Sequence, residues 1–335
     1  MVSGSLIVGL GRSGAGLHLP ALRRLPPELR DPMRPVLGWD PAVGSRAETA
    51  GVTVVASPAE AATRLDPATT VTHVCMPPRG RATVLAALAA CGFRRFVIEK
   101  PLAVDEAGLE ALLRIVGAHR LQVVPMSQWL SSTLTSRIEK IISSGMLGRL
   151  ISLTFRQRRP RFDRGLRDKQ HPTAFDVEIP HSLGAALRLA GGGQVCDAAW
   201  GDLRAGGVVV PRLGSAWLTV AHRGGVRTRI DSDLTSPVRE RRVHARFTGG
   251  TLTGWYPGSE ADHHAQLVVD DGRRRGHAVF LDDALGACVA DAYRYFATAG
   301  GQESATVTDR LAVNADVVRL LADAKRCAAR RNPGS

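Results

Sequence analysis

Long hydrophobic runs are absent from this sequence of 335 residues. No apolar stretch approaches the ~18 residues that a membrane-spanning helix requires. The first apolar segment, Leu6–Leu10, begins too close to the N-terminal methionine to leave room for the charged segment and apolar core of a signal peptide. We therefore expect a soluble, cytoplasmic protein with no membrane partner.

Cysteine is scarce and unpatterned. The sequence contains five cysteines, an odd number, and no C-x-x-C pair. They are Cys75, Cys91, Cys196, Cys288 and Cys327. Disulfide frameworks and zinc sites use paired or closely spaced cysteines, so this pattern argues against both. We expect no bound metal.

Lysine is also rare. Of the 44 basic residues, the only lysines are Lys100, Lys140, Lys169 and Lys325. The formal net charge of +13 raises the question of nucleic acid, because clustered cations bind phosphates. The arginines are instead spread along the chain, without the interleaved aromatic residues that stack on bases. The arginine bias indicates GC-rich codon usage, and we expect no nucleic-acid partner.

The composition, with 44% hydrophobic and 22% charged residues, is that of a globular protein, and the length fits two domains of about 150 residues each. In residues 1–125, short apolar runs alternate with helical stretches. The expected strands are Leu6–Leu10, Val36–Trp39, Val71–Met76, Phe96–Ile98 and Leu121–Val124. Strands that alternate with helices predict a doubly wound parallel sheet, the Rossmann arrangement.

Residues 126–304 follow a different pattern. Two helical segments, Thr133–Ser144 and Ala174–Ala190, precede a series of strands between residues 195 and 269 that have no helices between them. This predicts an α+β domain with an open-faced, mostly antiparallel sheet. A sheet covered by helices on one face leaves the other exposed, so we expect a homodimer or homotetramer. Residues 305–335 are predicted to form a C-terminal helix and tail.

A glycine turn of the form G-x-G-x-x-G, residues 9–14, lies between the first predicted strand and helix. Gly9 allows the tight turn, Gly11 lets the backbone approach a pyrophosphate, and Gly14 lets helix and strand pack closely. Asp40 ends the next predicted strand, where an acid binds the ribose 2′-hydroxyl. Its carboxylate repels a 2′-phosphate and favours NAD over NADP. Arg46, six residues further on, keeps NADP binding possible.

The triplet Glu99-Lys100-Pro101 directly follows a predicted buried strand. It therefore lies at the carboxyl edge of the sheet, where ligands of doubly wound folds bind. Lys100 is the only lysine of the first predicted domain. An ammonium can donate a proton or be tuned toward neutrality, which a guanidinium cannot do. The alternative for an isolated pair is a surface ion pair between Glu99 and Lys100.

With this triplet the sequence resembles the Gfo/Idh/MocA dehydrogenases, the family of glucose–fructose oxidoreductase and inositol dehydrogenase. The matching segments are GLGRSGAGLHLPAL (9–22), GWDP (38–41), CMPP (75–78), VIEKPLAVDEAGLEALL (97–113), IISSGMLGRLISLTF (141–155) and FTGGTLTG (247–254). The most specific element is E-K-P at this distance from the glycine turn. The resemblance implies NAD(P)-dependent oxidation of a sugar or cyclitol hydroxyl, or reduction of the matching ketone, by a dimer or tetramer. The cofactor-binding residues expected are Gly9, Gly11, Arg12, Ser13, Gly14, Asp40, Pro77, Glu99 and Lys100.

The family's second catalytic position is a histidine near the start of a helix, four residues after an aspartate. His181 fits, although Asp176 and Glu178 lie five and three residues before it. Either acid could orient the imidazole as a general base. The alternative is a histidine that caps the helix and is hydrogen-bonded into a domain interface. The sequence also departs from the family at Gly184, where an aspartate is common, and lacks the usual histidine after the PP segment, Arg81 being nearest.

These residues predict a mechanism in which His181 takes the hydroxyl proton and Lys100 stabilises the developing alkoxide, while hydride passes to the nicotinamide. The sequence alone does not fix which of the two accepts the proton. The catalytic residues expected are Lys100, His181, Asp176 and Glu178.

The substrate is expected to be a polyol or keto-sugar. Six arginines between Arg156 and Arg167, with Lys169, would bind a phosphate, carboxylate or nucleotide-sugar diphosphate, or would form a solvated surface. The substrate-binding residues expected are Lys100, Arg158, Lys169 and His181. An enzyme with such a substrate would fit a biosynthetic pathway for unusual sugars. Other readings are a lyase or glycosidase that uses NAD transiently, an imine or tetrapyrrole reductase, and a non-catalytic NAD sensor.

Overall fold

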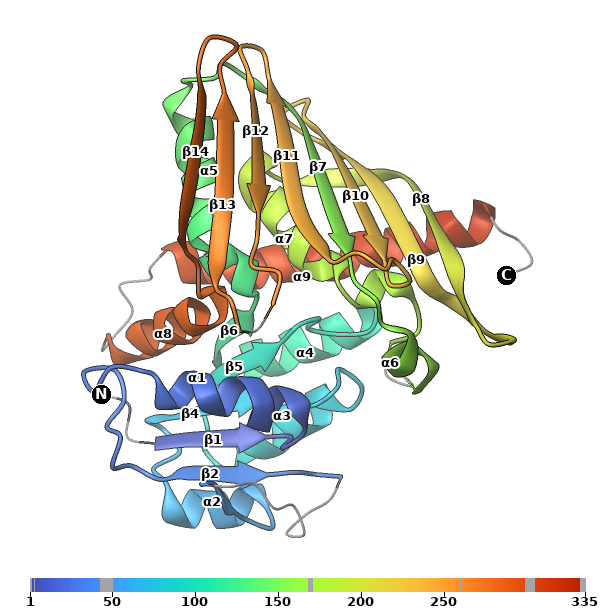
Figure 1. The fold of residues 1–335 in the computed structure, drawn as a ribbon. Coiled ribbons are helices and arrows are strands. Elements are labelled where there is room, and N and C mark those ends of the chain that lie inside the picture. Colours follow the sequence, from blue (N-terminus) through green and yellow to red (C-terminus); the bar gives the residue numbers. More distant parts are fainter. Residues whose placement is uncertain are drawn as a thin grey trace. The chain divides into compact units, whose positions relative to one another are not determined.

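The computed structural model describes residues 2, 4–42, 51–167, 171–259, 261–298 and 305–331. The chain divides into two compact units. The first comprises Met1–Gln128 and Leu285–Val318, and the second comprises Trp129–Ala284 and Arg319–Ser335. Figure 1 shows the elements of both.

The first unit is built on a parallel sheet with the strand order β3-β2-β1-β4-β5-β6. The strands are β1 (Gly4–Val8), β2 (Val36–Trp39), β3 (Thr53–Val54), β4 (Thr70–Val74), β5 (Arg95–Glu99) and β6 (Gln122–Met126). The chain winds outward from β1 in both directions, so the topological switch point lies at the carboxyl end of β1. This confirms the predicted doubly wound sheet. The short strand β3 was not predicted.

Helices pack on the sheet of the first unit. They are η1 (Gly14–His18), α1 (Leu19–Arg23), α2 (Pro58–Arg64), α3 (Arg81–Ala90), α4 (Glu106–Ala118), α8 (Ala284–Ala297) and the first part of α9 (Ala305–Arg331). Local capping fixes two of their starts: Ser57 Oγ accepts the N–H of Glu60, and Asp105 Oδ1 accepts the N–H of Gly108. Such caps satisfy N–H groups that lack a partner in the first helical turn.

The placement of α8 differs from the predicted boundaries, which assigned residues 126–304 to one domain. Val289, Tyr293 and Phe296 of α8 are buried in one hydrophobic cluster with Ile7 and Val97 of the parallel sheet. Burying a large apolar side chain stabilises by roughly 1.5–3 kcal/mol. This packing places most of α8 in the first unit.

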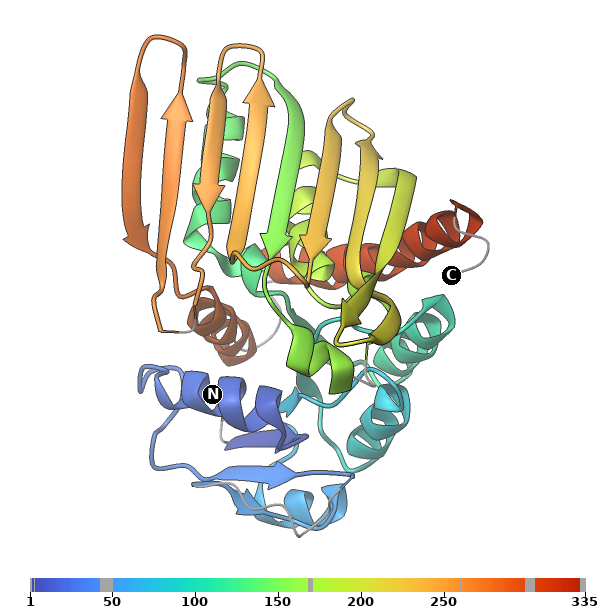
Figure 2. The same cartoon turned by 45° about the vertical axis from the view of Figure 1, so that its right-hand side comes forward.

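The second unit contains an eight-stranded sheet with the order β14-β13-β12-β11-β7-β10-β9-β8 (Figure 2). The strands are β7 (Leu150–Arg158), β8 (Gly193–Ala205), β9 (Val208–His222), β10 (Arg227–Asp233), β11 (Glu240–Phe247), β12 (Thr251–Trp255), β13 (His264–Asp270) and β14 (Arg275–Leu281). Strands β7 and β10 pair in parallel and the other pairs are antiparallel, which confirms the mostly antiparallel sheet. Strand β14 was not predicted, because this edge strand is largely exposed and lacks an alternating apolar pattern.

One face of this sheet is buried and the other is open. Leu153 and Phe155 of β7 are buried, whereas Thr154 between them is not. The helices α5 (Thr133–Ser144) and α7 (Ile179–Ala190) lie against the buried face (Figure 1). The remaining elements of this unit are η3 (Gln128–Ser131), α6 (Phe162–Arg167), η4 (Ala174–Asp176) and the end of α9.

The long helix predicted over Ala174–Ala190 is divided in the structure into η4 and α7. Pro180 stands in the first turn of α7, where its missing N–H costs nothing. Among the described helices, none combines the length and apolar character needed to cross a bilayer.

Candidate functional site

The glycine turn after β1 has the geometry that a dinucleotide requires. Gly9 has a φ of +89°, and a Cβ there would lie 2.9 Å from the backbone nitrogen of Met76. A Cβ on Gly14 would lie 2.0 Å from the carbonyl oxygen of Gly9. Around Gly11, in contrast, no described atom lies within 4 Å of a Cβ position. The turn therefore has no room for a side chain at Gly9 and Gly14, where it packs against the protein. It has free space at Gly11, where a pyrophosphate would approach.

Asp40 is bound to this turn. It follows β2, and its Oδ2 accepts the N–H of Leu10 at 2.9 Å, while Oδ1 accepts the N–H of Ala42 at 2.9 Å. A carboxylate oxygen has a second lone pair, so both oxygens can also accept from a ribose hydroxyl. Arg46, the residue that keeps NADP binding possible, lies outside the described residues.

Glu99, at the end of β5, is bound to the helix that follows the glycine turn. Its Oε1 accepts the Oγ–H of Ser13 at 2.6 Å and lies 3.0 Å from His18 Nε2. Its Oε2 accepts the backbone N–H of Lys100 at 3.1 Å. Burial raises the pKa of Glu99, but the hydrogen bond and charge of His18, with smaller contributions from Lys100 and Ser13, lower it to about 2. Glu99 is thus an ionised carboxylate that joins the turn to the Lys100 segment.

Arg81 holds the Lys100 segment from a second direction. Its Nη1 donates to the carbonyls of Glu99 at 2.7 Å, Pro101 at 2.5 Å and Leu102 at 3.1 Å. Its Nη2 donates to the carbonyl of Met76 at 2.6 Å. The side chain is fully buried, and burial lowers the pKa of Arg81 to about 10. From sequence, Arg81 stood out only as a departure from the family pattern.

The predicted residues of the first unit therefore gather at one edge of the parallel sheet. Gly9, Asp40, Pro77 and Lys100 each follow the carboxyl end of a strand, namely β1, β2, β4 and β5. Arg12 is exposed on the glycine turn and Pro77 is exposed after β4. The Lys100–Pro101 peptide is cis. This edge, beside the switch point, is where doubly wound folds bind ligands.

His181 belongs to the second unit and lies in the first turn of α7. Its backbone N–H donates to the Glu178 carbonyl at 3.2 Å. Its ring stacks on Trp129 with ring centroids 5.9 Å apart. Trp129 in turn stacks on Tyr256 with centroids 3.8 Å apart and planes 9° apart. The sequence reasoning missed both aromatic residues, since no pattern links them to His181.

The two candidate acids have different partners. Asp176 accepts the N–H and Oγ1–H of Thr173 through Oδ2, and its Oδ1 lies 2.5 Å from Lys325 Nζ of α9. Its carboxylate therefore joins η4 to the C-terminal helix. The Oε1 of Glu178 lies 2.8 Å from Arg159 Nη1. Glu178 is the acid that shares the turn with His181.

The predicted substrate arginine, Arg158, lies on the open face of the sheet. Its Nε lies 3.8 Å from Glu240 Oε2, and it lines a hollow of about 270 Å³ with Trp217 and Asp231. Arg159, the next residue, instead reaches Glu178. Arg159 is the first residue after β7, and the two neighbours have different acidic partners. Lys169 lies outside the described residues.

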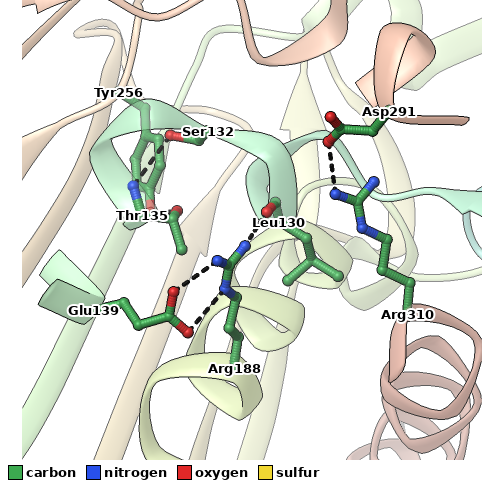
Figure 3. A network of polar contacts seen from close by, with 8 residues as sticks. All are labelled: Leu130, Ser132, Thr135, Glu139, Arg188, Tyr256, Asp291 and Arg310. Atoms are coloured by element: carbon green, nitrogen blue, oxygen red, sulfur yellow. Dashed lines mark hydrogen bonds and ion pairs between the residues drawn. The ribbon is translucent and has the colours of Figure 1, made fainter. Parts of the chain in front are cut away.

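A polar network anchors α7 to α5 and η3 (Figure 3). Arg188 of α7 binds both oxygens of Glu139 of α5, at 2.6 and 3.2 Å, and the carbonyl of Leu130. The hydroxyl of Tyr256 lies 2.9 Å from Thr135 Oγ1, and burial raises the pKa of Tyr256. In the first unit, Arg310 of α9 binds Asp291 of α8 at 2.7 Å, which Figure 3 also shows. These contacts hold α7 to α5 in the second unit and α9 to α8 in the first.

The described residues contain no cluster of three or more His, Cys, Asp or Glu side chains that could hold a metal ion.

No protein-family model matches the chain, and no curated protein matches it in sequence. Solved structures do match. They include KijD10, a 3-ketoreductase from Actinomadura kijaniata in complex with TDP-benzene and NADP, with 14% sequence identity and a TM-score of 0.75 over 97% of each chain. A NAD-binding oxidoreductase from Klebsiella pneumoniae has 17% identity and a TM-score of 0.76 over 98% of this chain and 97% of its own. The oxidoreductase yvaA from Bacillus subtilis has 16% identity and a TM-score of 0.76, over 98% of this chain and 97% of its own.

These similarities establish the fold. The chain has the two-domain α/β fold of these oxidoreductases, with a parallel Rossmann sheet and a second, mostly antiparallel sheet.

Proposed function

We propose that this protein is an NAD(P)-dependent oxidoreductase that transfers hydride between the nicotinamide and a hydroxyl or ketone of a sugar, cyclitol or nucleotide sugar. One observation carries the proposal: the glycine turn, Asp40 and Lys100 lie together at the carboxyl edge of one parallel sheet. The fold shared with the KijD10 ketoreductase, solved with NADP and TDP-benzene, supports it.

In this proposal the first unit holds the cofactor. The turn with Gly9, Gly11 and Gly14 binds the pyrophosphate, and Asp40 binds the adenosine ribose. Arg12, Ser13, Pro77 and Glu99 complete the binding residues. The bound nicotinamide supplies or accepts the hydride. The Asp40 carboxylate opposes a 2′-phosphate, which favours NAD over NADP.

The residues proposed for proton handling are Lys100 and His181. Lys100 donates a hydrogen bond to the reacting substrate oxygen and stabilises its negative charge. His181 moves the proton at the same oxygen, and Glu178 orients it. Asp176 stabilises the turn before α7 through Thr173 and Lys325. We also propose that the open sheet face of the second unit joins copies in a homodimer or homotetramer.

Replacing Asp40 with asparagine tests the cofactor preference. Asparagine keeps a side-chain oxygen for the Leu10 N–H but removes the negative charge. We expect the ratio of the NADPH to the NADH dissociation constant to fall about tenfold or more, measured by cofactor fluorescence. Asp31→Asn is the control, because Asp31 also accepts an N–H two residues on but lies elsewhere. An unchanged ratio would remove Asp40 from the ribose site.

In place of Arg158, which lies on the open face beside Glu240, we propose that Arg159, which reaches Glu178, binds an anionic substrate, and the two arginines form a matched pair that tests this. We expect Arg159→Met to raise KM for a nucleotide-sugar or sugar-phosphate substrate about tenfold or more, since a charge-assisted hydrogen bond is lost. Arg158→Met, on the open face, should leave KM within about twofold. Steady-state kinetics with neutral and phosphorylated substrates measures this. Equal effects of both variants would contradict the assignment.

The function itself is tested by cofactor turnover with a panel of nucleotide-linked keto-sugars, sugar phosphates and neutral polyols. Consumption of NADH or NADPH with one keto-sugar class supports the proposal. Cofactor that co-purifies and shows no net change while substrate is cleaved would favour the transient-redox lyase or glycosidase. Turnover only with imines or tetrapyrroles would favour that reductase class, and cofactor binding without turnover would favour a sensor.

A further inference from the structure

A chain of buried polar side chains runs through the interior of the first unit. Ser5 Oγ lies 2.7 Å from Tyr293 OH, which lies 3.1 Å from His73 Nε2. His73 Nδ1 lies 2.9 Å from His18 Nδ1. All four residues are fully buried. The chain reaches the candidate site through His18, whose Nε2 lies 3.0 Å from Glu99 Oε1.

The protons of this chain can be assigned from its geometry. Glu99 is an ionised acceptor, so His18 Nε2 must carry a hydrogen. Between the two facing Nδ1 atoms only one hydrogen fits. If His18 supplies it, His18 is an imidazolium paired with Glu99. If His73 supplies it, both imidazoles are neutral and the Glu99 carboxylate loses the charge of His18 and keeps only Lys100 and Arg81 as nearby cations, which is costly.

The surrounding charges favour the imidazolium. Burial lowers the pKa of His18, but the charge of the Cys75 sulfur and a hydrogen bond to it, followed by the hydrogen bond and charge of Glu99, outweigh burial and raise it to about 10. His73 responds in the opposite direction. Burial, the charge of His18 and the charge of Arg30 all lower its pKa. His18 is therefore the cation, and neutral His73 accepts its Nδ1–H.

We propose that His18 is a positioning residue for Lys100. As an imidazolium it neutralises Glu99 inside the first unit and keeps that carboxylate bound to the Lys100 N–H and to Ser13 of the glycine turn. The dinucleotide turn and the lysine segment are thereby joined through one ion pair. The role of Lys100 rests on the proposed function, whereas the ion pair does not.

The ion pair is tested on the wild-type protein, without substrate. In a pH titration of protein carrying ¹⁵N-labelled histidine, we expect one of the ten imidazoles to stay protonated until about pH 10. This signal should vanish in His18→Gln, which retains an N–H donor but no charge. If every histidine of the wild type deprotonates below about pH 8, near the ordinary range, the proposal fails.

Stability provides a second test with a defined sign. The His18 pKa is raised on folding, so its stabilisation is complete below the unfolded value of 6.5 and disappears as pH rises toward 10. The Tm difference between wild type and His18→Gln should therefore shrink by about 5 °C or more between pH 6.5 and 10. The control is His222→Gln, since His222 is a buried imidazole whose pKa burial lowers. Its Tm difference should change only below about pH 6.5.

Turnover then separates positioning from a purely structural role. In His18→Gln, the uncompensated Glu99 charge should preserve the Lys100 ammonium to higher pH and move the alkaline limb of the kcat profile up by about one pH unit. We expect kcat to fall about tenfold, with the cofactor Kd within about threefold. An unchanged kcat profile in an active enzyme would overturn the positioning role. A wild type that turns over no substrate but shows the late-titrating imidazole would contradict the proposed function and leave the ion pair standing.

Discussion

Replacing Lys100 with methionine is expected to lower turnover by roughly 10²-fold or more while cofactor binding survives. Methionine approximates the length and apolar stem of lysine but cannot donate a hydrogen bond to the substrate oxygen. The contacts that hold this position use backbone atoms of residues 99–102 and the Glu99 side chain, which the substitution leaves in place. Steady-state kinetics and NADH fluorescence titration measure the two effects.

Lys140→Met is the matched control, since Lys140 is exposed on α5. It removes one of the few lysines without touching the sheet edge, and turnover should stay within about twofold. A Lys100→Met enzyme with near-normal turnover would remove Lys100 from the reaction. Loss of cofactor binding together with turnover would instead make Lys100 a cofactor-binding residue only.

The second large effect is expected at Arg81. Arg81→Met should lower the free energy of unfolding of the first unit by about 3–5 kcal/mol, because four carbonyl oxygens in and around the Lys100 segment lose their shared donor. Turnover should fall as well, since a loosened segment no longer fixes Lys100. Chemical denaturation followed by tryptophan fluorescence and hydrogen exchange of residues 99–102 measures the loss.

The control is Arg79→Met, an exposed arginine two residues away. It should change stability by less than about 0.5 kcal/mol. Arg81→Lys should restore only part of the stability, because an ammonium cannot reproduce the planar fork of donors. Unchanged hydrogen exchange of the Lys100 segment in Arg81→Met would show that other contacts suffice to hold it.

Arg81 and Glu99 together explain why a single lysine can be held accurately at a sheet edge. Arg81 binds the carbonyls of residues 99, 101 and 102, while the Glu99 carboxylate binds the Lys100 N–H and the glycine-turn helix. The backbone on both sides of Lys100 is thus fixed by buried groups. Preorganisation of this kind is what a catalytic side chain requires from its support.

The sequence alone was sufficient to predict features that depend on interactions between residues close together in the chain. The glycine turn was predictable because Gly9 and Gly14 occupy positions that exclude a Cβ. The start of helix α2 at Pro58 is decided locally in the same way, because the Ser57 cap and Pro58 act within one turn. The two sheet types followed from whether helices separate the strands.

Only the tertiary structure shows which side chains from distant parts of the sequence contact one another. His18 lies 55 residues from His73, and His73 lies 220 residues from Tyr293, so no local pattern could join them. The same holds for Asp176 and Lys325, and for the burial of α8 with the parallel sheet. Periodicity in a sequence reports which face of an element is buried, but not which distant element covers it. Contacts between distant segments form only when the chain has folded, and they determine the charge of His18 and the position of Lys100.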